Sequence, residues 1–146
     1  MALLLDAYES FRRDVTLVTE NVHWAVLLRQ RQVTAGAMII LLKAEKSRLS
    51  ELTREEAHEF LSVCSELERF ARDTLQAEKF NYLALMMVDP IVHFHFLPRY
   101  SGPREFFGMS IEDPGWPGVP LLDQGPVLDS LTASSIARNL MSQVHL

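Results

Sequence analysis

The sequence predicts an α+β fold in which an antiparallel sheet packs against one long helix. Two observations favour this fold: strand-like segments stand before and after one strongly amphipathic segment, and short polar links join neighbouring strand-like segments. The chain has 146 residues, of which 48% are hydrophobic and 23% are charged, as in an ordinary globular domain. We therefore expect a single domain over residues 1–146, with a core at about 15–105 and a C-terminal extension at 106–146.

The long helix is the clearest element. Thr53 and Glu56 have the spacing of a capping box, which satisfies backbone N–H groups at a helix start. Apolar residues then recur every three or four positions and form one stripe that ends at about residue 77. The stripe consists of Ala57, Phe60, Leu61, Cys64, Leu67, Ala71 and Leu75. The opposite face is charged, and we interpret it as solvated surface.

The other elements are shorter. Strands are predicted at 15–19, 22–28, 36–43, 80–87 and 91–97, with an edge strand within 105–111. The second and third of these are joined by the polar residues 29–32, which predicts an antiparallel pair. Pro98 is expected to end the last strand of the core. Short helices are predicted at the N-terminus, over about 3–11, and at the C-terminus, within 130–144.

The charge and the single cysteine narrow the possible partners and compartments. A net charge of -5 argues against a nucleic-acid duplex as a partner. Cys64 cannot form an internal disulfide, and we expect a buried thiol in a reducing compartment. The N-terminus lacks the pattern of a signal peptide, and the apolar run 37–42 is far shorter than the ~20 residues that span a bilayer. These features predict a cytoplasmic protein without a membrane partner.

The residues that suggest chemistry are His93 and His95. Side chains alternate between the two faces of a strand, so both imidazoles project on one side. The apolar residues beside them, Val92, Phe94 and Phe96, are expected to pack on the other side against the core. Imidazoles can act as nucleophile, base or acid near neutral pH, and the nearby Arg99 can hold phosphate oxygens bidentately. This combination suits an anionic substrate.

Spacing alone leaves three interpretations of this His-x-His pair: a catalytic pair, a metal site or two surface histidines. A metal site needs a third ligand, and no glutamate follows the pair before Glu105. His23 and His58 lie on other predicted elements, and neither has a ligand spacing of its own. A metal site is therefore the weaker functional interpretation.

The segment 91–99, with the sequence Ile-Val-His-Phe-His-Phe-Leu-Pro-Arg, resembles the motif of the histidine triad hydrolases and transferases. That motif is His-x-His-x-His followed by two apolar residues and often by Pro-Arg. Four further segments, 21–28, 36–43, 49–56 and 80–83, resemble the family's early strands, the start of its long helix and the strand before the triad. The resemblance covers about residues 15–105 and implies the histidine triad variant of the predicted α+β fold.

The resemblance also implies a mechanism. His93 aligns with the family's nucleophile, which attacks the α-phosphate of a nucleotide and forms a nucleotidyl-histidine. His95 aligns with the third histidine, which contacts the phosphate and the leaving group, and Arg99 is the predicted phosphate-binding cation. Implied substrates are dinucleoside polyphosphates, other nucleoside polyphosphates or nucleotide phosphoramidates. No cofactor is implied, the covalent step needs no metal, and family members commonly form homodimers.

Trp24, Leu28 and Asn81 are candidate residues of the nucleotide pocket. The family's base and ribose usually lie against the early strands, which contain Trp24 and Leu28. Core packing is the alternative role for these two residues.

Four positions depart from the family pattern: Ile91 replaces the first histidine, Ala37 replaces a common histidine, and Met86 and Met87 replace small or polar residues. Ile91 removes a donor but keeps the backbone carbonyl, which in the family orients the nucleophile's other ring nitrogen. The methionines place apolar bulk near a polar site. Loss of one donor to a developing anion slows catalysis by ~10² to 10³. The sequence is therefore compatible with an enzyme and, alternatively, with a catalytically impaired nucleotide-binding module.

Overall fold

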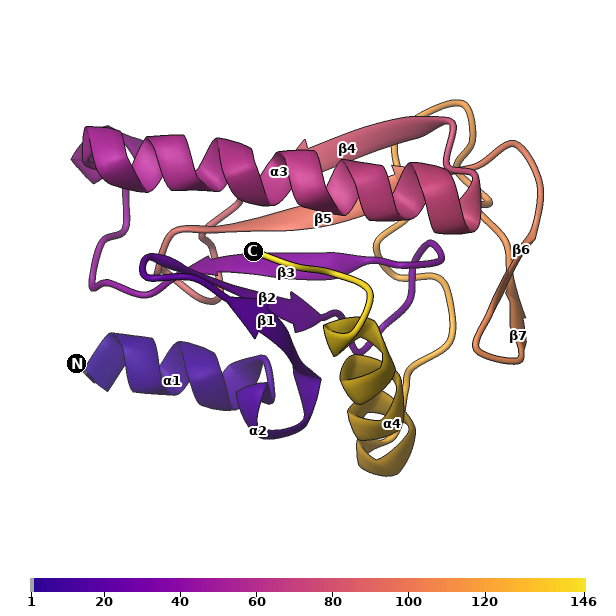
Figure 1. Ribbon diagram of the computed structural model, residues 1–146, viewed down its shortest axis with the longest axis horizontal. Coiled ribbons are helices and arrows are strands. Elements are labelled where there is room, and N and C mark those ends of the chain that lie inside the picture. The colour runs from indigo at the N-terminus through magenta and orange to yellow at the C-terminus, as the bar shows by residue number, and fades with distance from the viewer. Residues whose placement is uncertain (1) are drawn as a thin grey trace.

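The computed structural model describes residues 2–146 and contains a five-stranded antiparallel sheet with the order β1-β2-β3-β5-β4. The strands are β1 (Leu17–Glu20), β2 (Trp24–Leu28), β3 (Met38–Leu42), β4 (Lys79–Leu83) and β5 (His93–Arg99). The long helix α3 (Arg54–Leu75) covers one face of the sheet, and α1 (Ala2–Ser10) and α4 (Ser130–Met141) lie on the other side (Figure 1). The predicted α+β fold is confirmed.

The centre of the sheet is the predicted antiparallel pair of β2 and β3. Trp24 pairs with Leu42 and Leu28 with Met38. Every residue of both strands is buried, because helices cover both faces of the sheet. These two strands give the neighbouring β5 a fixed support.

Helix α3 begins as predicted, with the Thr53 side chain accepting from the backbone N–H of Glu56 in a capping box. Its buried stripe is rotated from the predicted one. Leu61 is 66% exposed, whereas Val63 and Phe70 are buried. The rotation follows from the contact with the sheet, where Phe60 packs against Trp24 and Phe94.

Most predicted strand boundaries are wrong by one to four residues, and three of the differences have a clear physical cause. Residues 15 and 16 belong to the short helix α2 (Arg13–Thr16), where the Thr16 hydroxyl donates to the carbonyl of Arg12. Strand β4 stops at Leu83 because the chain then turns, with Met86 in the left-handed region at φ 46°. Strand β5 continues through Pro98, since its pairing with β3 ends at Phe96 and the missing N–H of Pro98 interrupts no ladder there.

The C-terminal region adds a hairpin and a helix. The predicted edge strand at 105–111 is two strands, β6 (Arg104–Phe106) and β7 (Met109–Ile111), because Phe107 and Gly108 form a turn with positive φ angles. Asp129 caps α4 by accepting from the N–H of Thr132. A 3₁₀ turn, η1 (Leu49–Glu51), precedes α3. Among residues 2–146, no helix combines the length and apolarity that a membrane span requires.

Candidate functional site

The site begins with the two histidines of β5, which share the sheet face opposite α3. His95 pairs with Ile39 and His93 with Leu41, so β3 fixes the position of both along the sheet. The two rings meet edge to face with their centroids 5.2 Å apart. The predicted juxtaposition of His93 and His95 on one face is therefore present.

The N-terminal helix covers this face, which the sequence did not reveal. The rings of Phe11 and His93 lie 5.1 Å apart, and His93 is only 4% exposed. The Ser10 hydroxyl donates to the Asp89 carboxylate at 3.0 Å and so ties the end of α1 to the loop before β5. A ligand that reaches His93 must therefore pass beside or displace the end of α1.

The tautomer of His93 follows from its one hydrogen bond. Nδ1 lies 2.7 Å from the carbonyl oxygen of Ile91. A carbonyl only accepts, so a neutral His93 carries its proton on Nδ1 and its lone pair on Nε2. The Ile91 carbonyl thus orients the ring, as the resemblance implies. Val92 holds this segment in place, because its N–H donates to the carbonyl of Lys46 and its carbonyl accepts from the N–H of Leu42.

His95 has the opposite tautomer. The Nε–H of Arg29 donates to His95 Nδ1 at 3.3 Å. A guanidinium only donates, so Nδ1 holds the lone pair and Nε2 carries the proton. Burial, the Arg29 charge and His93 together lower the pKa of His95 to about 4. His95 is therefore a neutral N–H donor at neutral pH.

Arg29 is a cation without an anionic partner. Within residues 2–146 it makes no ion pair, and its hydrogen bonds go to His95 and to the carbonyl of Arg31 at 2.9 Å. Burial and then the charge of Arg31 lower the pKa of Arg29. Two arginines and a neutral imidazole therefore form a positively charged corner that no described carboxylate neutralises.

This corner opens into a cavity of about 200 Å³ beside His95. The cavity is lined by Ser10, Phe11, Leu28, Arg29, Gln30, Arg31, Ile39 and His95. Leu28, predicted as a pocket residue, lines this cavity, but strand alternation places its side chain with that of Trp24 on the α3 face, so its pocket role stays a prediction. The volume suits one or two phosphate groups rather than a whole nucleotide, because pockets for small molecules commonly enclose about 300–1,000 Å³.

Sequence reasoning missed Arg29 because residues 29–32 looked like a polar link. In the structure Arg29 extends the ladder of β2, and its N–H donates to the carbonyl of Ala37 at 3.0 Å. Its side chain therefore follows Leu27 on the histidine face. The sequence signal for this orientation is the alternation of side chains along the strand, continued by one residue beyond Leu28.

The loop after Arg29 is held from two sides. The Gln32 side chain is fully buried; its amide donates to the carbonyls of Arg29 and Ala37, and its Oε1 accepts from the N–H of Gly36. The segment before α4 packs against the other side, where the Gln32 N–H donates to the carbonyl of Pro126 at 2.8 Å. The loop is thus a rigid support for the Arg29 guanidinium.

The structure places Arg99 away from the histidines, in a buried ion pair, and its phosphate role stays a prediction. Arg99 lies six residues beyond His93, or roughly 20 Å along an extended strand. Its Nε and Nη2 donate to both carboxylate oxygens of Asp113, at 2.6 and 3.0 Å, and its Nη1 donates to Asn81 at 2.6 Å. The Arg99 and Asp113 side chains are 4% and 1% exposed. Asn81, predicted to line the nucleotide pocket, therefore supports this buried ion pair.

Two other predictions change. Trp24 is fully buried on the α3 face, where its indole N–H donates to the carbonyl of Glu56 at 2.8 Å, so it does not wall a pocket with the histidines. Met87 is 83% exposed, and its side chain therefore does not fill the histidine site.

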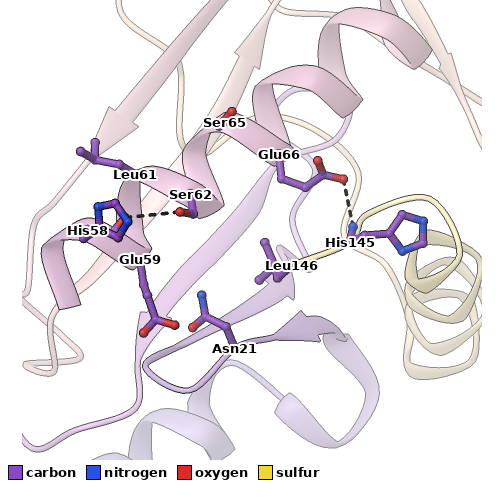
Figure 2. Close-up of a pocket in the computed structure, with 9 residues that line it drawn as sticks. All are labelled: Asn21, His58, Glu59, Leu61, Ser62, Ser65, Glu66, His145 and Leu146. Atoms are coloured by element: carbon purple, nitrogen blue, oxygen red, sulfur yellow. Dashed lines mark hydrogen bonds between the residues drawn. The ribbon is translucent and has the colours of Figure 1, made fainter. Parts of the chain in front are cut away.

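A larger hollow of about 620 Å³ lies along α3 and the C-terminal tail (Figure 2). Its two histidines, His58 and His145, lie at opposite ends, and its lining does not include the histidines of β5. Across residues 2–146, no group of three or more His, Cys, Asp or Glu side chains is arranged to hold a metal ion. The His-x-His pair therefore has no third protein ligand in this conformation.

Comparisons with solved structures identify the fold. A histidine triad protein from Marinobacter aquaeolei VT8 superposes with a TM-score of 0.70 at 24% identity, covering 94% of this chain and 96% of its own. A second, from Sinorhizobium meliloti 1021, gives a TM-score of 0.70 at 19% identity over 93% and 94% of the two chains. The chain has the histidine triad fold. A hypothetical histidine triad nucleotide-binding protein from Sulfolobus tokodaii strain7 shares this fold at a TM-score of 0.66 and 13% identity, over 97% and 92% of the two chains.

No family model and no curated protein sequence matches the chain. The likeness therefore shows the histidine triad fold and leaves the chemistry to the residues of the site.

Proposed function

We propose that the chain binds a nucleotide by its phosphates at the histidine face and that His93 attacks the α-phosphate. The observation that carries this proposal is the hydrogen bond from His93 Nδ1 to the Ile91 carbonyl, because it leaves the Nε2 lone pair free as a nucleophile. The shared fold with a protein described as nucleotide-binding supports the choice of ligand.

The proposed reaction has two steps. His93 Nε2 forms a bond to the α-phosphorus, the bond from that phosphorus to the leaving group breaks, and its electron pair goes to the leaving atom. Water or another acceptor then attacks the same phosphorus and releases His93. The Nε2–H of His95 donates a hydrogen bond to the developing charge, a contribution of about 10²–10³ in rate for one well-placed donor.

The test is formation of the nucleotidyl-histidine. The protein is incubated with dinucleoside polyphosphates and nucleotide phosphoramidates, and the intact mass is measured at neutral pH together with product release. We expect an adduct on the wild type and on His58→Ala, which removes a histidine of α3, and no adduct on His93→Ala. Equal adduct or turnover in wild type and His93→Ala, or none in either, contradicts the proposal.

A second candidate is a nucleotide-binding module without turnover. The observation that favours it is the cover of Phe11 over His93. It predicts calorimetric binding of a nucleoside monophosphate without an adduct, and little gain of activity in Ile91→His. A trapped adduct in the wild type excludes it.

The proposed partner of the chain is a second copy of itself. Strand β4 is an edge of the sheet, and Leu85, Met87 and Val88 are exposed just beyond it. An open edge next to apolar side chains favours pairing with another strand. Light scattering after size exclusion tests this: the wild type should be a dimer, the double variant Met87→Glu with Val88→Glu should be a monomer, and Leu131→Glu on α4 should stay dimeric. A monomeric wild type contradicts the homodimer.

A further inference from the structure

Arg29 and Arg31 form a positively charged corner beside His95, and the proposed mechanism gives neither arginine a role. These three residues line the cavity of about 200 Å³, and neither guanidinium group forms an ion pair with a described carboxylate. Half-burial of an unpaired cation costs free energy, because the lost hydration of a charge is offset only by an opposite charge or by hydrogen bonds. Such an arrangement is explained when the missing anion is a ligand.

We propose that Arg29 is a positioning residue that holds His95 as an Nε2–H donor and that Arg29 and Arg31 together receive an anionic leaving group. Building on the proposed function, this assigns the substrate class: phosphoric anhydrides such as nucleoside polyphosphates, in preference to phosphoramidates.

The hydrogen bond from Arg29 to His95 fixes the tautomer of the imidazole. Because Arg29 Nε–H already points at Nδ1, a second proton on that nitrogen would face another N–H. His95 therefore keeps one proton, on Nε2, for as long as Arg29 is in place. The low pKa of about 4 agrees with this geometry.

A neutral imidazole can donate a hydrogen bond to a leaving group but does not readily give it a proton. A phosphate leaves an anhydride as an anion and needs hydrogen bonds and positive charge, but no proton. An amine leaves a phosphoramidate only after it takes a proton, which a neutral His95 does not readily supply. The geometry therefore favours P–O over P–N cleavage.

Hydrogen bonds also hold the two arginines of the corner in place. Arg31 donates to the carbonyls of Asp123 and Gly125, at 3.4 and 3.1 Å, and these neutral acceptors leave its charge uncompensated. Arg29 is anchored through the carbonyl of Arg31 and through Gln32. Both residues line the cavity and both guanidinium groups are held by hydrogen bonds, so a phosphate beside His95 would lie close to Arg29 and in the field of Arg31.

The experiment that tests the positioning role does not need activity. The ring nitrogens of ¹⁵N-histidine protein are assigned by long-range ¹H–¹⁵N NMR at pH 7 in the wild type, Arg29→Gln, Arg29→Lys and the control Arg72→Gln, which removes an exposed arginine of α3. We expect His95 to be protonated on Nε2 alone in the wild type and control, to mix tautomers in Arg29→Gln and to recover partly in Arg29→Lys. A wild-type spectrum in Arg29→Gln, or a proton on Nδ1 in the wild type, overturns the role.

The anion subsite is tested with inorganic pyrophosphate as the probe. We expect it to shift the His95 ring signals of the wild type and to bind at least 10-fold more weakly to Arg29→Gln, with Arg72→Gln unchanged. No His95 shift in the wild type, or equal affinity in Arg29→Gln, overturns the subsite.

Failure of the two proposals can be told apart. Arg29-dependent pyrophosphate binding without any nucleotidyl-histidine removes the proposed catalysis and keeps the subsite. An adduct that forms equally fast in wild type and Arg29→Gln, with an unchanged ratio of anhydride to phosphoramidate cleavage, removes the inference and keeps the catalysis.

Discussion

The buried Arg99 of β5 and the half-buried Arg29 beside that strand have opposite surroundings. Arg99 lies at the end of the strand, where Asp113 neutralises it through two hydrogen bonds and Asn81 accepts a third. Arg29 lies beside His95, where its partners are an imidazole and a carbonyl. An arginine that is paired with an internal carboxylate stabilises the fold. An arginine without such a carboxylate keeps its charge available to a ligand.

Removal of the Asp113 carboxylate should give the largest effect. Asp113→Ala leaves Arg99 buried without a counter-charge, which costs about 3–5 kcal/mol of unfolding free energy. Urea unfolding measures it. Asp73→Ala, which breaks the exposed Arg72–Asp73 pair, should cost less than about 1 kcal/mol. The double change Arg99→Met with Asp113→Leu should recover most of the loss, and a single-variant cost below about 1 kcal/mol would contradict a structural role for this pair.

Acid should destabilise the folded protein through His95, the hydrogen-bond partner of Arg29. The pKa of His95 is about 4 in the folded protein and 6.5 ordinarily, so below about pH 6.5 the unfolded chain binds a proton that the folded chain refuses until about pH 4. Stability is therefore lost as the pH falls through this window, by roughly 3 kcal/mol at most. Urea unfolding at pH 7 and 4.5 should show a loss about 1–3 kcal/mol larger in the wild type than in His95→Gln. Equal losses would mean that His95 titrates normally.

The loop that supports Arg29 can be weakened by a substitution in the segment before α4, which packs against that loop. Gly125 has a φ of 97°, and a Cβ there would overlap the carbonyl of Gln32. Gly125→Ala should therefore cost ~1–3 kcal/mol and weaken pyrophosphate binding. Gly102→Ala is the matched control, because its added Cβ meets nothing within 4 Å and should change neither quantity. Normal pyrophosphate binding by Gly125→Ala would show that the anion site does not depend on the packing of this loop.

Removal of Arg29 should affect stability least. Arg29→Met loses two hydrogen bonds but also an uncompensated charge, so the unfolding free energy should change by less than about 1 kcal/mol while pyrophosphate binding is lost. A cost near that of Asp113→Ala would show that Arg29, like Arg99, is structural.

Local patterns in the sequence predicted much of the fold. The capping box at Thr53 and Glu56 and the pairing of β2 with β3 are present as predicted, since capping and alternation depend on residues a few positions apart. The shared face of His93 and His95 follows from alternation within one strand. These features need no knowledge of the rest of the chain.

The remainder depends on contacts between distant residues. Arg29 and His95 are 66 positions apart, and Arg99 and Asp113 join a strand to a loop. The cover of Phe11 over His93 joins the first helix to the last strand of the sheet. No periodicity records such contacts, so the sequence pointed to Arg99 as the phosphate-binding residue and interpreted Arg29 as part of a polar link.

The docking of residues 125–128 onto the Arg29 loop predicts an order of events during folding. The Gln32 N–H donates to the carbonyl of Pro126, and the Leu128 N–H donates to the carbonyl of Gln30. Contacts between such distant segments form late, because closing a long loop costs entropy before the contact offsets it. During synthesis the sheet and both histidines are made before residues 125–128, so the Arg29 corner would form only after this segment has been added. Pyrophosphate affinity would then report that residues 125–128 of a newly made chain have docked onto the Arg29 loop.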